Sequence, residues 1–523
     1  MRQRITFLHK PEDAPDPSSL VVTNTSLTGP ALSAAREDRI TLALEELPEE
    51  LRQVLQSCHE LHIRWVSSHP YDTISPLYSR LSPGLHVFLT PRADSTFQGD
   101  GQLCAALKSA FGNLDCDTPK TSFTSLPSDR FSHSTAFQYY QPLDDLSVFT
   151  KYVGKDLCHS PASASSSTGS SSCASRVDLL STASSLDISY DTISHALKVT
   201  GTWGFQDQPL RVVAPEAGNH RVEVGILATD KPHGIEPHEL GLSGSLTVLG
   251  QDKKPAATIF KFPARHRRVD GASFSAAFLQ PAGLHPTLQL RLHGAAAAPP
   301  DLGGDDGSSH CSLHAHLTLP RVIFADQYQL SDSLLLASKN LTALRYISQP
   351  VDLEAPDYAL KTWGSAALLE LAPPPPSPKT TLEEVWTAEV PLHLRYLSPA
   401  AGGYRTAQLP HPAVFWACTT EEGTKFPASP FERVNLGYDG LFGPRTVFWH
   451  VDPVAQDSAG GARLLSEVRV PVLDVDRSGW VSAGTAAVVL LGFGWVAWKL
   501  LAVYLRTGYG PQQQMEGLEK KKQ

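Results

Sequence analysis

The feature that most constrains this chain is a long apolar stretch near its C-terminal end, Trp480 to Leu505. Within it, Val481 to Trp498 is an uncharged run of 18 residues. About 20 apolar residues cross the roughly 30 Å hydrocarbon core of a bilayer as a helix, because a lipid-exposed segment must satisfy its own backbone polar groups. The stretch therefore predicts a transmembrane helix over 480–505. A buried core helix is the alternative, and no other part of the chain is this apolar.

One charged residue, Lys499, lies inside this stretch, six residues before Leu505. Its long side chain can reach the nearer membrane surface by snorkelling. The alternative is that Lys499 pairs with an acid on a partner helix, which makes it a candidate partner-helix contact. Small residues at four-residue spacing, such as Ser482 and Ala486, would let such a helix approach closely.

The flanks of the stretch predict its orientation. Arg506 and Lys520 to Lys522 follow it, whereas the acidic Asp474 and Asp476 precede it. Because basic residues collect on the cytosolic side of a membrane helix, we expect a cytosolic C-terminus and residues 1 to about 479 on the other side.

The C-terminus carries a candidate address. The chain ends in KKKQ, so Lys520 and Lys521 stand at the fourth and third positions from the end. Lysines at these positions resemble the dilysine signal that returns membrane proteins to the endoplasmic reticulum, and a solvated basic tail is the alternative. Two sequons, at Asn24 and Asn340, are candidate N-glycosylation sites and are compatible with a lumenal location.

The N-terminal 20 residues contain neither the apolar h-region nor the small-residue cleavage site of a secretory signal peptide. The sequence thus shows no recognisable device for translocating the region before the span.

The remainder of the chain has the pattern of a mainly β protein. Its 41 prolines and 37 glycines fit short strands joined by frequent turns. We expect a lumenal mixed α/β region at 1–157, a Ser-rich linker at 158–176, a lumenal all-β, sandwich-like domain or domains at 177–472, and a cytosolic tail at 506–523. In the first region, Leu42 to Ile63 is predicted to be partly helical, because apolar residues recur there at three- and four-residue spacing.

Individual strands are predicted from short apolar runs between turn residues. The clearest alternation is in Val390 to Tyr396, where Val390, Leu392, Leu394 and Tyr396 share one face. The other predicted strands are 63–66, 84–89, 210–213, 222–228, 244–249, 287–293 and 312–319.

Composition excludes some classes of protein and site. A formal charge of −9 and a pI near 6.1 argue against nucleic-acid binding. The seven cysteines include no CxxC pair and no cysteine–histidine spacing typical of zinc. We expect at most one or two disulfides and at least one free thiol.

Few residues suggest catalysis. There is no GxSxG elbow, P-loop or GxGxxG after a strand. His314 and His316 would share one face of a strand and could bind metal, but no third ligand has matching spacing, so a satisfied polar strand face is favoured. Asp474 and Asp476 resemble the DxD of glycosyltransferases, a pattern that is common by chance. Asp305-Asp306 is interpreted as a solvated loop. We therefore predict no catalytic, cofactor-binding or metal-binding residues.

Several long segments closely resemble the PIG-X/Pbn family, most of all its fungal members. The resemblance covers most of the chain apart from the Ser-rich linker and the insertions. The segments that carry it are 311–330, 337–341, 352–372, 390–399 and 409–418, with similar stretches at 266–292 and 1–17.

The resemblance implies a role in the endoplasmic reticulum as a non-catalytic, stabilising subunit of GPI mannosyltransferase I. That enzyme adds the first mannose, from dolichol-phosphate mannose, to the GPI-anchor precursor, and its multi-spanning partner subunit carries the active site. Fungal members also lack an obvious cleavable signal. Two alternatives remain: a lumenal folding factor for a subset of proteins in that compartment, and an enzyme in its own right that uses Asp474 and Asp476.

Overall fold

The structure is a computed structural model, and it describes residues 1–78, 80–92, 101–127, 136–158, 177–214, 220–231, 235, 239–300, 310–348, 351–374, 385–419, 429–431, 438–458 and 461–508. The chain divides into two compact units. The first unit comprises 1–396 and 407–468, and the second comprises 397–406 and 469–523. The Ser-rich segment 159–176, Asp305-Asp306 and the lysines at 520–522 lie outside the described residues.

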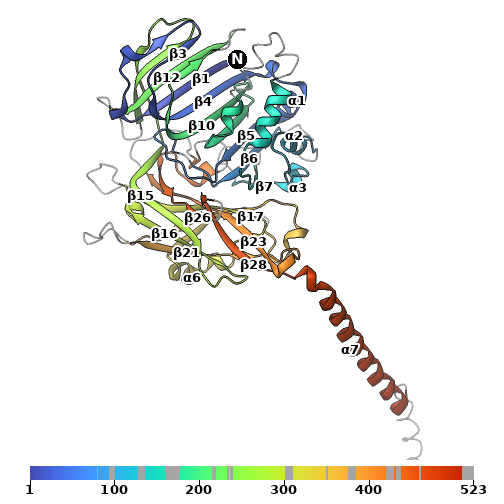
Figure 1. Ribbon diagram of the computed structural model, residues 1–523. Coiled ribbons are helices and arrows are strands. Elements are labelled where there is room, and N and C mark those ends of the chain that lie inside the picture. Colours follow the sequence, from blue (N-terminus) through green and yellow to red (C-terminus); the bar gives the residue numbers. More distant parts are fainter. Residues whose placement is uncertain are drawn as a thin grey trace, which may run out of the picture. The chain divides into compact units, whose positions relative to one another are not determined.

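The first unit contains an 11-stranded sheet, here called the first sheet. Figure 1 shows β1, β4 and β12 side by side within it. β1 is parallel to β12 and antiparallel to β4. The strand order is β14 (Ala256–Pro263), β13 (Glu239–Val248), β12 (Arg221–Asp230), β1 (Arg2–His9), β4 (Leu32–Ala43), β10 (Ala196–Gln208), β9 (Ser185–Asp191), β5 (Cys58–Val66), β6 (Gly84–Pro91), β8 (Phe137–Gln141) and β7 (Thr124–Ser125).

Strands of the first sheet alternate apolar and polar residues, so their apolar side chains point to one face. Helices cover this apolar face. Leu61, Ile63 and Trp65 of β5 join the buried cluster that contains Val54 of α1 and Leu107 of α2. The α-helices beside this sheet are α1 (Glu49–Ser57), α2 (Gln102–Phe111), α3 (Pro119–Ser122) and α4 (Ser147–Tyr152), which continues into a π turn at Val153–Leu157. A second cluster lies between β1, β12 and a small sheet of β11 (Arg211–Val213), β3 (Ser26–Thr28) and β2 (Val21–Val22).

The first unit also holds an eight-stranded sheet, the second sheet. One short helix, α6 (Ser333–Ser338), precedes its strand β19 and is capped by Asp332, which accepts bonds from the backbone N–H groups of Leu334 and Leu335. The strand order is β19 (Leu341–Ile347), β20 (Gly364–Leu371), β17 (Cys311–Pro320), β24 (Ala413–Thr419), β25 (Thr446–Pro453), β15 (His266–Phe278), β16 (Thr287–Gly294) and β21 (Trp386–Pro391).

Smaller elements complete the chain. The two-stranded sheets are β18 (Ile323–Phe324) with β22 (His393–Leu394), β23 (Tyr404–Pro410) with β28 (Leu465–Pro471), and β26 (Gln456–Ser458) with β27 (Gly461–Arg463). The 3₁₀ turns are η1 (Pro11–Asp13), η2 (Pro17–Ser19), η3 (Leu44–Glu46), η6 (Ala295–Ala297), η7 (Gln329–Ser331), η8 (Asp357–Ala359), η9 (Ala401–Gly403), η10 (Tyr438–Leu441) and η11 (Val475–Arg477).

The second unit ends in α7 (Ser478–Thr507), which has 30 residues. Among the described residues it is the one helix long and apolar enough to cross a membrane, and none of it is buried against the protein. This agrees with the span predicted at 480–505, and the mainly β fold class is confirmed by the two large sheets.

Other expectations need adjustment. The helix predicted within 42–63 is α1, and Cys58 and Leu61 lie instead on β5. The linker expected at 158–176 does not separate two sheets, because β5 pairs with β9 and β10 pairs with β4 in the first sheet. Strand pairing between segments far apart in sequence leaves no trace in local periodicity.

The strand predicted at 390–396 is broken into β21 and β22. Val390, Leu392 and Leu394 are buried as expected, but Tyr396 is exposed and Arg395 is buried. The guanidinium of Arg395 lies 4.3 Å from the ring centroid of Phe324 and donates to the carbonyl of Ala355, so the alternation reverses at its end.

The expected number of disulfides was too low. Cys104 pairs with Cys116, Cys311 pairs with Cys418, and Cys158 is also disulfide-bonded. Cys58 is a free thiol among the described residues, as an odd count requires, and burial raises its pKa to about 12.

Candidate functional site

The two large sheets meet inside the first unit at an inter-sheet junction. Trp363, just before β20, donates from Nε1 to the backbone oxygen of Gln138 on β8 (2.8 Å) and to Thr124 Oγ1 on β7 (3.0 Å). Tyr438 donates to Gln138 Oε1 at 2.9 Å, and Tyr346 on β19 donates to the backbone oxygen of Ser125 at 2.7 Å. Side chains of the second sheet and its flanking segments therefore hydrogen-bond to polar groups at the edge of the first sheet, so the junction is a specific contact.

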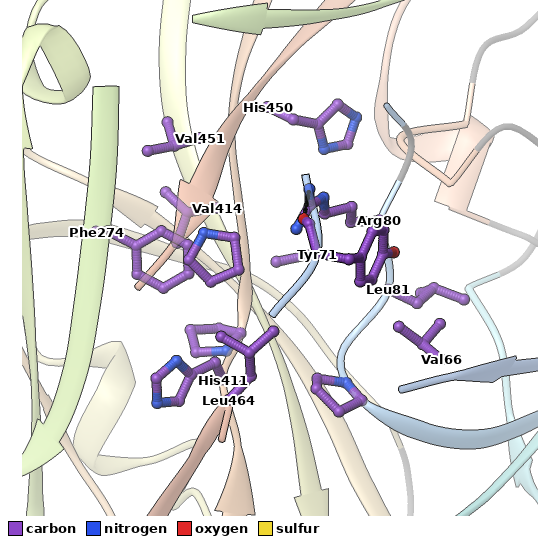
Figure 2. A pocket seen from close by; sticks show the side chains of 14 residues that line it. Val66, Tyr71, Arg80, Leu81, Phe274, His411, Val414, His450, Val451 and Leu464 are labelled. Atoms are coloured by element: carbon purple, nitrogen blue, oxygen red, sulfur yellow. Dashed lines mark hydrogen bonds between the residues drawn. The ribbon is translucent and has the colours of Figure 1, made fainter. Parts of the chain in front are cut away.

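A small cavity lies beside this junction (Figure 2). Its volume is about 20 Å³, which is enough for one water molecule. Val66 on β5 and Arg80 in the loop after β5 line it from one side. Phe274 and His450 on the second sheet line it from the other, together with His411 in the connection between β23 and β24. Pockets that hold small ligands are commonly 300–1,000 Å³, so this cavity does not accommodate a sugar or a lipid headgroup.

Two arginines and one carboxylate form an ionic cluster at the edge of the cavity. Asp452 on β25 lies 2.8 Å from Arg268 Nη2 and 3.5 Å from Arg80 Nη2. Arg80 also donates to the backbone oxygen of Tyr71 at 2.9 Å, and Figure 2 shows it stacked on the Tyr71 ring, 4.5 Å from the centroid. The shared carboxylate joins the loop after β5 to strands of the second sheet.

The neighbours of Arg268 in this cluster stabilise its positive charge. Partial burial works against the charge on Arg268, but Asp452 and Tyr78 outweigh it and raise the Arg268 pKa. Burial raises the pKa of Tyr78 to about 12, so this phenol keeps its proton and accepts a 2.8 Å bond from Arg268. Arg268, which also lies 3.3 Å from Asp72, thus keeps its charge and its hydrogen bond to Tyr78 near neutral pH, which suits a structural joint.

The histidines at the junction are neutral. Burial lowers the pKa of His266 to about 3 and that of His450 far below its ordinary value, and their ring nitrogens lie 3.2 Å apart. His411 is buried with a pKa lowered to about 4, and within the described residues neither of its ring nitrogens has a partner. No group of three or more His, Cys, Asp or Glu residues in the described part of the chain is arranged to hold a metal ion.

The predicted pair His314 and His316 lies on β17, and both side chains are buried. His314 Nε2 contacts Ser312 Oγ at 2.8 Å, and His316 Nε2 lies 3.1 Å from the hydroxyl of Tyr438. Burial lowers both pKa values to about 3. The two rings therefore serve as neutral hydrogen-bonding groups inside the second sheet.

The predicted DxD residues stand directly before α7. Asp474 accepts a 3.1 Å bond from the backbone N–H of Asp476 and caps the turn η11. Its carboxylate also lies 3.7 Å from Arg477. These contacts give Asp474 a local role in starting the helix.

The candidate glycosylation residues are both exposed but differ in their contacts. Asn24 lies in the turn between β2 and β3. Asn340 has a positive φ of 57° and donates from its side-chain nitrogen to the backbone oxygen of Thr387 at 2.8 Å. A glycan at Asn340 would have to leave one N–H for this bond.

Within α7, the ammonium of Lys499 lies 4.7 Å from the ring centroid of Trp495. Trp495 is one turn closer to the N-terminal end of the helix. The side chain therefore points along the helix away from its C-terminal end, which is the opposite of the direction expected for snorkelling to the nearer surface.

Sequence reasoning missed the cluster of Arg80, Arg268 and Asp452. These residues come from three distant segments, and neither their spacing nor their periodicity marks them. The one available signal was the run His266-Arg267-Arg268 on a predicted β region, since buried arginines need carboxylate partners.

Comparisons with known proteins agree along the whole chain. A family model described as PIG-X / PBN1 matches residues 281–501. The chain is 56% identical to "Protein pbn1" of Neurospora crassa, with all of both chains covered. It is 46% identical to "Protein PBN1" of Gibberella zeae, covering 98% of this chain and 97% of the relative. It is 42% identical to "Protein pbn1" of Emericella nidulans, covering 98% of each.

Proposed function

Because the chain belongs to the PIG-X/PBN1 family, we propose that it is a non-catalytic subunit of GPI mannosyltransferase I that stabilises the multi-spanning catalytic subunit. The observation that carries the proposal is the similarity over the full length to proteins named PBN1, which includes both sheets and the apolar helix. The water-sized cavity beside the inter-sheet junction is too small to hold a sugar donor, which is consistent with a non-catalytic role.

The stabilising effect follows from mass action. A subunit that binds only the folded enzyme adds RT ln(1 + [L]/Kd) to its stability, about 2.7 kcal/mol at one hundred times Kd. In this proposal the first unit and α7 supply the surfaces that bind the catalytic subunit, and the active site lies in that subunit.

The location is part of the proposal. The chain would reside in the endoplasmic reticulum with residues 1 to about 479 in the lumen and the tail in the cytosol, since basic residues follow α7. Lys520 and Lys521 would then act as the retrieval signal. Replacing both by serine should move the protein to later compartments, while protease added to intact microsomes should leave the bulk of the chain protected.

Lys499 is the proposed contact with a partner helix. Its ammonium lies over Trp495, toward the middle of α7, where an unpaired charge is costly. A carboxylate on a transmembrane helix of the catalytic subunit would neutralise it. Lys499→Leu should weaken co-isolation of the two subunits in mild detergent, and Lys499→Arg is the matched control that keeps the charge.

Deleting the chain tests the central claim. The abundance of the catalytic subunit should fall severalfold, because unpartnered folded enzyme unfolds and is degraded. An unchanged amount of inactive catalytic subunit would reject a stabilising role.

Two further measurements separate the alternatives. If Asp474→Ala with Asp476→Ala abolished mannose addition while the partner stayed abundant, the chain would itself be the enzyme. Co-isolation of many unrelated lumenal proteins would instead favour a general folding factor.

A further inference from the structure

The residues just before α7 form a small structure of their own, which we call the juxtamembrane collar: 397–406 and 469–477. Three backbone hydrogen bonds close it: Ala400 N–H to Leu473 O (3.1 Å), Val472 N–H to Gly403 O (3.0 Å) and Val475 N–H to Ala400 O (3.3 Å). Gly402 and Gly403 have φ values of 79° and 72°, a left-handed turn that other residues rarely adopt. The backbone of the collar is therefore held in place.

This fixed backbone presents apolar side chains outward. Leu473 is 45% exposed and Val475 is 49% exposed. Trp480, one turn and a half further along, is 84% exposed. These apolar residues lead directly into α7, so they extend its exposed apolar surface toward the N-terminal side.

The length of α7 places the collar relative to a bilayer. Its 30 residues extend about 45 Å, which equals the full thickness of a bilayer including both headgroup layers, about 40–45 Å. The three residues of η11 add about 6 Å at 2.0 Å per residue. Together these lengths, about 51 Å, exceed the thickness of the bilayer, and a helix that is too long accommodates by tilting. At a tilt of about 30°, which is within the usual range, Leu473 and Val475 lie at the level of the headgroups on the N-terminal side of α7.

The polar residues of the collar suit the same environment. Arg469 stacks on Tyr404, with its guanidinium 4.7 Å from the ring centroid, and both side chains are exposed. Arg405 is exposed next to Tyr404 and donates to the backbone oxygen of Pro399 at 3.2 Å. Tyrosine and tryptophan concentrate at membrane interfaces, and guanidinium groups bind phosphate oxygens in pairs.

We propose that the juxtamembrane collar lies in the headgroup layer of the bilayer, with Leu473 and Val475 inserted among the lipids and Arg405 and Arg469 on lipid phosphates. The occupant of this surface is the membrane itself, because the collar is continuous with the helix that crosses it. Insertion of the collar fixes the depth and tilt of α7.

Fluorescence quenching of the full-length protein tests the proposal. Val475→Cys, labelled with an environment-sensitive dye, is incorporated in nanodiscs of phosphatidylcholine and phosphatidylglycerol. Labelling goes to the new thiol because the free Cys58 is buried. Lipid spin-labelled near the headgroup should quench the dye strongly, and iodide should quench it severalfold less than it quenches the dye attached to N-acetylcysteine. Val488→Cys, in the middle of α7, is the reference for full lipid contact.

Two results would overturn the insertion. Iodide quenching equal to that of the free conjugate would place Val475 in water, and shielding from both quenchers would mean that protein covers it. Arg405→Gln with Arg469→Gln should raise iodide quenching at position 475 and leave the label at 488 unchanged. Equal quenching with and without the arginines would reject their phosphate contacts.

Discussion

The first sheet keeps its internal polar groups charged and paired, whereas the second sheet keeps several histidines neutral in its interior. Glu223 on β12 is 2% exposed and lies 2.9 Å from Arg2, 2.9 Å from Arg4 and 2.8 Å from Arg221. Burial raises the pKa of Glu223, but the hydrogen bonds from Arg2 and Arg4 outweigh it, so the pKa lies below its ordinary value.

The second sheet and its neighbouring segments contrast with this arrangement. Six histidines there have lowered pKa values, against one in the first sheet, and the cause in each case is mainly burial. They are His266, His314, His316, His393, His411 and His450 in the second region and His86 in the first. Two sheets of one unit thus depend on pH through different groups and over different ranges.

Mild acid should therefore open the second sheet before the first. In the unfolded chain a histidine binds a proton below about pH 6.5, whereas in the folded protein these buried histidines stay unprotonated down to about pH 3 to 4. Their contribution to the free energy of unfolding is therefore fully present above about pH 6.5 and is lost as the pH falls below it. Each histidine contributes about 1.4 kcal/mol per pH unit within that window. Hydrogen exchange at pH 7.5 and 5, corrected for intrinsic rates, should show exchange rising in β17 and not in β1.

The matched control is His316→Gln, which retains a hydrogen-bonding side chain beside Tyr438 but does not titrate. It should reduce the steepness of the acid transition by about one proton. Equal acid sensitivity of both sheets would remove the contrast.

The two disulfides for which both cysteines are described should differ in the stability that they confer. Cys311 and Cys418 are separated by 107 residues and join β17 to β24, whereas Cys104 and Cys116 are separated by 12. Because a longer closed loop restricts the unfolded chain more, removing the first pair by double alanine substitution should cost about 5 kcal/mol and removing the second about 3. Denaturant unfolding of the detergent-solubilised protein measures both, and equal losses would contradict the loop argument.

Trp363 should couple the two sheets. Trp363→Ala removes a buried side chain and its bonds to Gln138 and Thr124, so we expect a loss of about 4 kcal/mol. Trp363→Phe, which keeps most of the apolar volume, should cost about 1 to 2 kcal/mol. If Trp363 joins the sheets, the alanine variant should unfold in two separate transitions in calorimetry; a single transition would show that other contacts suffice.

The smallest effect is expected in the first sheet. Glu223→Gln weakens contacts to three arginines that are themselves partly exposed, so the loss should be about 1 kcal/mol. Thermal unfolding should report it, and exchange in β17 should not change. A loss as large as that of Trp363→Ala would mean that the ion pairs of Glu223 stabilise the fold far more than the exposure of the three arginines suggests.

Local elements could be predicted from the sequence because their signals are local. The alternation of Leu288, Leu290 and Leu292 identifies β16, and the uncharged run after Trp480 identifies α7. Strand order could not be predicted. The pairing of β1 with β12 depends on a match between residues 2–9 and 221–228, and no short-range pattern encodes it.

In the candidate site, too, residues close in sequence could be predicted and residues brought together by the fold could not. The two histidines of β17 were noticed because their spacing of two residues is visible in the sequence, and a satisfied polar strand face was the favoured interpretation. Their burial could not be predicted, because it depends on segments that pack over β17. The pairing of Cys311 with Cys418 and the sharing of Asp452 by Arg80 and Arg268 arise only after β17, β24 and β25 have assembled.

The central place of β1 in the first sheet has a consequence for biosynthesis. Its antiparallel neighbour β4 emerges soon after it, but its parallel neighbour β12 begins at Arg221. At about 5–20 residues per second, translation needs roughly 10 to 45 s to deliver that strand. During this interval the backbone N–H and C=O groups along one edge of β1 have no partner strand. This edge of the β1–β4 pair can bind other chains or a chaperone. β1, the first strand of the protein, is therefore among the last strands of its sheet to gain both of its neighbours, and its unpaired edge can aggregate until then.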